Sequence, residues 1–191
     1  MKQTGRVVYV TGAPGVGKTS VIAKLVQNKN DIAVFEYGCQ MANHLVGRTQ
    51  EELRGGTDSL VRKEDIIEVN AKMIEWTSSI RATKTVLIDT HQVTFEEHGY
   101  RVAPFQGDEL RLLGITDILV LVAPDEIVVS RISANHGGRR IPSLFQARVH
   151  AEAQLQVAIS YSVLLGVEAR IIETGRAIEV VADDIKKALE L

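Results

Sequence analysis

Residues 12–19 of this 191-residue chain read Gly12-Ala13-Pro14-Gly15-Val16-Gly17-Lys18-Thr19. The stretch satisfies the pattern G-x-x-x-x-G-K-[ST], in which glycines let successive backbone N–H groups turn inward toward phosphate oxygens. A β-branched run precedes it and an amphipathic segment beginning near Ser20 follows it, so motif and flanks agree. Because the following helix adds the partial positive charge of its N-terminus, residues 12–20 predict a phosphate-binding loop (P-loop) for a nucleoside triphosphate.

Three side chains define the chemistry expected at this loop. Lys18 is predicted to reach the β- and γ-phosphates, and the Thr19 hydroxyl is predicted to ligate Mg²⁺. Asp89 ends an apolar run and projects from the carboxyl edge of the expected sheet, where α/β proteins bind ligands. This is the Walker B position, from which a carboxylate orients Mg²⁺ through water. The sequence therefore predicts Mg²⁺ as the cofactor.

Apolar, β-branched runs alternate with longer segments of helical periodicity, which is typical of a parallel sheet covered by helices on both faces. The expected strands are residues 6–11, 32–36, 85–89, 117–123 and 169–173. The runs at 86–88 and 118–122 are continuously apolar, so these strands should be central. We expect an α/β fold with a five-stranded parallel sheet, and one P-loop kinase domain over residues 1–191.

Several helix boundaries carry recognisable signals. Thr49 with Glu52 and Ser143 with Gln146 fit the capping box, which satisfies free N–H groups at a helix start. Gly166 suits the left-handed residue that ends a helix, so the long helix beginning at Ser143 should stop there.

The composition excludes some classes of partner. The formal net charge is −2, from 22 basic and 24 acidic residues, and lacks the basic excess of nucleic-acid-binding domains. No apolar run approaches the roughly 18 residues that span a bilayer. The single cysteine, Cys39, has no partner for an internal disulfide. We expect a cytoplasmic protein that binds neither nucleic acid nor membrane.

Two segments are long and polar or glycine-rich enough to be mobile, residues 90–107 and 135–142. The second carries Arg139 and Arg140 and follows the helix with Arg131, so it is predicted to be a lid. Guanidinium groups brought over the γ-phosphate stabilise the transferring phosphoryl group and exclude water, which favours a kinase. The alternative is a solvated basic surface loop.

Further short stretches carry a resemblance to a known family. They are residues 10–19, Phe35-Glu36-Tyr37-Gly38 with Met41, Glu52-Leu53-Arg54, Ile88-Asp89-Thr90-His91 and Gly99-Tyr100. With these stretches the chain resembles the archaeal-type adenylate kinases, a family of P-loop nucleoside monophosphate kinases, over nearly its whole length.

The resemblance implies the reaction of ATP with AMP to give two ADP, and, because the family often forms trimers, a possible homo-oligomer. It implies that Lys18 and the lid arginines are catalytic, and that Arg54 grips the monophosphate. The residues implied in catalysis are Lys18, Arg131, Arg139 and Arg140, and those implied in acceptor binding are Gly38, Met41, Arg54 and His91.

The chain departs from the family pattern mainly in the acceptor half. Gly55-Gly56 stand where the family has Lys-Leu, residues 101–106 replace a proline-rich loop, and the lid spaces its arginines differently. Two other functions therefore stay open. In a small-molecule or nucleoside kinase, Asp89 would act as the general base for a hydroxyl acceptor. In an ATPase switch protein, water would be the acceptor. The choice between ATP and GTP as donor is also open.

Overall fold

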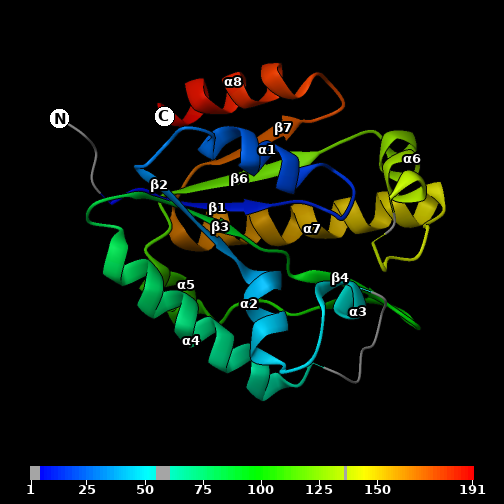
Figure 1. Cartoon of the computed structure of the whole chain (residues 1–191), viewed down its shortest axis with the longest axis horizontal. Helices are drawn as coiled ribbons and strands as arrows, with labels where there is room; N and C mark the ends of the chain where they lie inside the picture. Colours follow the sequence, from blue (N-terminus) through cyan, green and yellow to red (C-terminus); the bar gives the residue numbers. More distant parts are fainter. Residues whose placement is uncertain (1–4, 55–60, 136) are drawn as a thin grey trace.

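The computed structural model describes residues 5–54, 61–135 and 137–191. Its centre is a five-stranded sheet of order β2-β3-β1-β6-β7, in which every neighbouring pair is parallel (Figure 1). The strands are β1 (Val7–Thr11), β2 (Ile32–Glu36), β3 (Thr85–Asp89), β6 (Asp117–Val122) and β7 (Ala169–Glu173). The expected fold class is confirmed, with β1 and β6 each one residue shorter than predicted.

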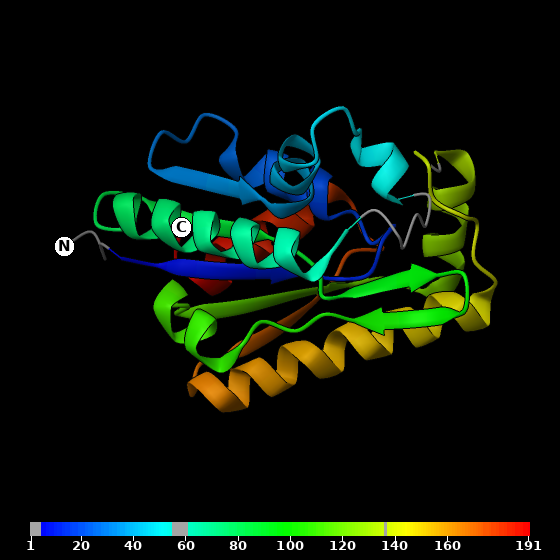
Figure 2. The same ribbon diagram turned by 90° about the horizontal axis from the view of Figure 1, so that it is seen from below.

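Helices cover both faces of this sheet and make two separate apolar layers (Figures 1 and 2). On one face lie α1 (Lys18–Val26), α6 (Asp125–Ala134) and α8 (Ile178–Leu189). On the other lie α4 (Lys63–Ile80), α5 (Gly107–Leu113) and α7 (Leu144–Leu165). Because successive strand residues point to opposite faces, Val8 and Val10 enter the first layer while Val7 and Tyr9 enter the second.

The helix boundary signals are confirmed where the structure describes them. Ser143 caps α7 by accepting a bond from the Gln146 N–H, and the Gln146 side chain accepts one in return from the Ser143 N–H at 2.9 Å. Gly166 ends the helix with a left-handed φ of 67°. Thr49 and Glu52 make the same reciprocal pair at the start of α3 (Gln50–Arg54). Local sequence therefore fixes both helix starts.

Residues 90–107, which the sequence marks as long and polar enough to be mobile, contain secondary structure that the sequence analysis did not predict. Most of the segment is an antiparallel hairpin of β4 (Val93–Glu96) and β5 (Gly99–Val102), which lies over α7. Val93 is fully buried, and the Tyr100 hydroxyl donates to the Gln146 carbonyl of α7. These long-range contacts order a stretch whose glycine and polar residues read as a loop when taken alone.

The ends of β1, β2 and β3 bring the nucleotide motifs to one edge of the sheet. Val10 and Glu36 both pair with Asp89, and the P-loop begins directly after β1. Gly12 lies so close to the Leu121 carbonyl oxygen of β6 that an added Cβ would collide with it. Its φ of 155° also disfavours a side chain. A glycine is therefore required where the chain leaves the sheet.

Among the described residues, no helix combines the length and apolarity that a membrane span requires.

Candidate functional site

The P-loop is held in place by two groups from other parts of the chain. The Val16 carbonyl oxygen accepts bonds from Arg131 Nη1 at 3.0 Å and from the Thr174 hydroxyl at 2.5 Å. Arg131 Nη2 also donates to the Thr174 carbonyl oxygen at 2.9 Å. Arg131 thus ties the loop to the segment after β7. Gly17 then takes a left-handed φ of 97° and α1 starts at Lys18.

This geometry places Arg131 differently from the lid role expected of it. Its guanidinium group is engaged with the back of the P-loop, and Arg131 is absent from the described lining of the pocket in front of that loop. The contacts favour a positioning role through the backbone of residues 15–16. Sequence reasoning placed Arg131 beside the lid and missed the partner, Thr174, because the two lie 43 positions apart.

The Lys18 ammonium lies 3.2 Å from Asp89 Oδ1, and both side chains are only partly exposed. The exposed Thr19 joins them at the same pocket. A hydroxyl and a carboxylate fit Mg²⁺, which binds oxygen ligands and takes most of its shell from phosphates and water in such sites. Among the described residues, no group of three or more His, Cys, Asp or Glu side chains could hold a metal. The donor set therefore suits Mg²⁺ that arrives with a nucleotide.

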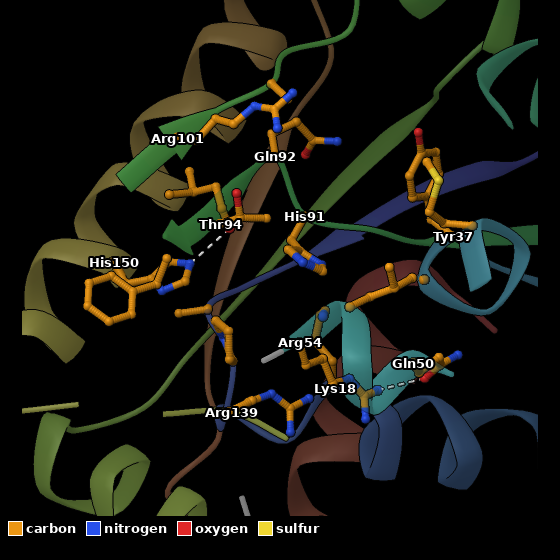
Figure 3. A pocket seen from close by; sticks show the side chains of 18 of the residues that line it. Lys18, Tyr37, Gln50, Arg54, His91, Gln92, Thr94, Arg101, Arg139 and His150 are labelled. Carbon is orange, nitrogen blue, oxygen red and sulfur yellow. Dashed lines mark hydrogen bonds between the residues drawn. The ribbon is translucent and has the colours of Figure 1, made fainter. Parts of the chain in front are cut away.

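One pocket of about 320 Å³ joins the P-loop to the predicted acceptor residues (Figure 3). Its volume lies within the usual range for small-ligand sites. The predicted site residues that line it are Ala13, Pro14, Lys18, Thr19, Gly38, Met41, Arg54, Asp89, His91, Arg139 and Arg140. Residues 12, 15–17 and 20 are absent from the described lining. The Val16 side chain is buried, so this position can meet a ligand through its backbone alone.

A cluster of basic side chains lies at the P-loop end of the pocket. Figure 3 shows Lys18, Arg54 and Arg139 on one side of His91. Arg54 Nη2 donates to Gln50 Oε1 at 2.8 Å, which orients the guanidinium group. Burial and the neighbouring Arg54 lower the pKa of Arg139. Like charges held this close are stabilised by an anion between them, and guanidinium groups bind phosphate through paired N–H groups.

His91 has its charge suppressed by these surroundings. The residue lines the pocket and is exposed to solvent there. Desolvation by the surrounding protein, followed by the charges of Lys18, His150, Arg139 and Arg54, lowers the pKa of His91 from 6.5 to about 3. His91 is therefore a neutral imidazole near pH 7, able to donate or accept a hydrogen bond without adding charge.

The predicted lid packs against α3. An added Cβ on Gly138 would collide with the Glu51 backbone, and Gly138 has a left-handed φ of 81°. A Cβ on Gly137 would lie 3.9 Å from Arg54 Nη1 and 3.7 Å from Arg139 Nη1. The two glycines thus let the segment approach the helix that carries Arg54. His136 of the predicted lid and the Gly55-Gly56 departure lie outside the described residues.

A polar network beside the pocket was not predicted from the sequence. The Tyr37 hydroxyl donates to Asn70 Oδ1 at 2.9 Å, and Asn70 Nδ2 donates to Glu109 Oε1 at 3.1 Å. Asn70 is buried, and Tyr37 contacts the Phe105 ring edge to face. Tyr37, Asn70 and Phe105 line the pocket. These residues come from α2 (Tyr37–His44), α4 and the segment before α5. Nothing in their local sequence signals that they meet.

Comparisons with known proteins agree with this site. A family model described as an AAA domain matches residues 11–144. Archaeal proteins named adenylate kinase align with the chain at low identity. The protein from Thermococcus kodakarensis is 28% identical, over 97% of this chain and 95% of its own length. Those from Pyrococcus furiosus and Methanoculleus marisnigri are 24% and 25% identical, over 97% and 88% of this chain and 95% and 89% of their own lengths. The family model matches more than half of this chain, so the chain belongs to the AAA domain family. It is a P-loop phosphotransferase of the nucleoside monophosphate kinase type.

Proposed function

We propose that the chain is an adenylate kinase, which transfers the γ-phosphoryl group of Mg²⁺-ATP to AMP and releases two molecules of ADP. The observation that carries the proposal is the single pocket shared by the P-loop and by Arg54 and His91. A transfer enzyme must hold a donor and an acceptor phosphate in one enclosed space. The names of the archaeal relatives, which span the chain at 24–28% identity, support AMP as the acceptor.

The donor phosphates would lie in the P-loop, with Lys18 against the β- and γ-phosphates. Lys18 would exchange its contact with Asp89 for the phosphates, which frees the carboxylate to face the metal. When bound through Thr19 and water on Asp89, Mg²⁺ supplies charge neutralisation between the β- and γ-phosphates.

The acceptor phosphate would lie between Arg54 and Arg139, beside the neutral His91. A phosphate acceptor is already ionised near neutral pH, so no general base is required. Positioning and charge stabilisation then carry the catalysis. Arg139 and the exposed Arg140 extend from residues 135–142, which we propose as the lid that excludes water from the transferring group.

The test is product analysis after incubation with Mg²⁺-ATP, alone and with each common nucleoside monophosphate in turn. The proposal expects ADP to form from both partners with AMP, and expects little free phosphate. Steady release of free phosphate that no monophosphate changes would replace the proposal with an ATPase. Transfer to a nucleoside hydroxyl, abolished by Asp89→Asn, would replace it with a small-molecule kinase in which Asp89 acts as the base.

A further inference from the structure

The β4–β5 hairpin lines the pocket with side chains from both of its faces, among them the polar pair Thr94 and Arg101. In an antiparallel pair, side chains directly opposite one another share a face, and neighbours along a strand alternate. Phe95 pairs with Tyr100 on the face that packs on α7. Thr94 pairs with Arg101 on the other face, together with Glu96, and all three line the pocket. The hairpin is therefore a wall of the acceptor half.

Arg101 is oriented on that wall by its neighbours. Its Nη1 lies 3.5 Å from Glu96 Oε1, and the Thr94 hydroxyl donates to the same oxygen at 3.4 Å. The Arg101 side chain is 37% exposed, and that of Glu96 is 22% exposed. Among the described residues, Arg101 donates to Glu96 through Nη1 alone, so Nη2 and Nε are available to donate to a ligand. The pair offers N–H donors and a carboxylate acceptor side by side.

Arg101 lies apart from the phosphate-binding cluster. In Figure 3, Lys18, Arg54 and Arg139 lie on one side of His91, while Arg101 and Gln92 lie on the other. The side chains whose charges lower the pKa of His91 are Lys18, His150, Arg139 and Arg54. A nucleotide whose phosphate lies among Arg54 and Arg139 would have the hairpin at the opposite end of the same pocket.

We propose that Arg101, held by Glu96, determines specificity by contacting the base of the acceptor nucleotide. This inference rests on the proposed function. The edge of a nucleobase carries hydrogen-bond donors and acceptors next to one another, and a guanidinium group beside a carboxylate matches such an edge. For adenine, Glu96 accepts from the exocyclic amine while Arg101 donates to a ring nitrogen. The phosphate-binding groups at the other end supply affinity but do not distinguish one base from another.

The test compares Arg101→Met with the wild-type protein across AMP, GMP, CMP and UMP. We expect the KM for the preferred monophosphate to rise about tenfold, the loss typical of a paired arginine–base contact. The kcat and the KM for ATP should stay near wild type, and discrimination among the four monophosphates should narrow. Arg101→Lys keeps the charge and should recover part of the loss. Arg111→Met serves as the matched control, because Arg111 is exposed and pairs only locally with Asp108 at 3.2 Å among the described residues.

Inhibition by ribose 5-phosphate, which has a phosphate and a sugar but no base, shows whether Arg101 contacts the base or another part of the nucleotide. As a competitive inhibitor against the monophosphate, it should keep the same inhibition constant in wild type and Arg101→Met. An equal rise in both constants would assign Arg101 to the phosphate or sugar and overturn the inference, as would unchanged KM values and ranking. If the wild-type protein transfers phosphate to none of the four monophosphates, the proposed function itself fails. A thermal unfolding curve for each variant separates misfolding from lost recognition.

Discussion

Lys18 of the P-loop and Asp89 at the end of β3 form an ion pair, with Nζ 3.2 Å from Oδ1. The two residues come from the motifs that bind phosphate and metal, and the parallel pairing of β1 with β3 sets their separation. Without a nucleotide, the Lys18 ammonium and the Asp89 carboxylate serve as each other's counter-ion. Both lie at the pocket, where phosphate and Mg²⁺ respectively are expected to bind.

Replacing Lys18 with Ala should reduce phosphoryl transfer by about 10²–10³-fold or more, because a charge that stabilises the transferring group is lost. The fold should persist, since the side chain borders a solvent-accessible pocket. Asp89→Asn should lower kcat and raise the Mg²⁺ concentration needed for half-maximal rate without changing the preferred acceptor. Rates across a Mg²⁺ titration check both variants. Full activity in Lys18→Ala would mean that the nucleotide site lies elsewhere.

Arg54→Ala should raise the KM for the monophosphate at least tenfold and leave the KM for ATP within about twofold, since a guanidinium–phosphate contact is among the stronger hydrogen-bonded pairs. Arg48→Ala is the matched control, because Arg48 is exposed and lies just before α3. Arg48 is not among the described residues that line the pocket. Steady-state kinetics with each substrate varied in turn provide the comparison. Equal changes in both KM values would remove Arg54 from the acceptor site.

Variants of Arg131 and Arg140 should distinguish a structural role at the P-loop from a role in the lid. Arg131→Met should lower the free energy of unfolding by about 2 kcal/mol, because charged hydrogen bonds to the Val16 and Thr174 carbonyls are lost. It should also raise the KM for ATP by loosening the P-loop. Arg140→Met, at an exposed position, should lower kcat with little change in stability. Urea unfolding and kinetics on both variants test this. A stable Arg131→Met with only a kcat defect would restore the lid role to Arg131.

His91 should make stability depend on pH in a defined direction. Its pKa is about 3 in the folded chain and near 6.5 when unfolded, so the unfolded state binds more protons between these values. Stability contributed by the neutral ring is thus complete above pH 6.5 and is lost progressively as pH falls toward 3. His91→Gln should therefore show a smaller drop in Tm between pH 7 and pH 5 than wild type. Identical drops would show that His91 titrates normally.

The sequence by itself determined the α/β class, the five strands and the P-loop. These follow from interactions that are local along the chain: β-branched runs favour strands, the glycines of residues 12–17 permit the phosphate-binding turn, and reciprocal caps start α3 and α7. It also named Lys18 and Asp89, because a motif and a strand end mark them directly.

Only the tertiary structure decided the remainder of the site. The contact of Arg131 with Thr174, the folding of residues 93–102 onto α7 and the meeting of Tyr37 with Asn70 join positions far apart in sequence. Such contacts depend on how helices pack on the sheet, and no local periodicity encodes them. The same packing directs Arg101 toward the pocket, whereas from its sequence neighbours alone it is one arginine in a short loop.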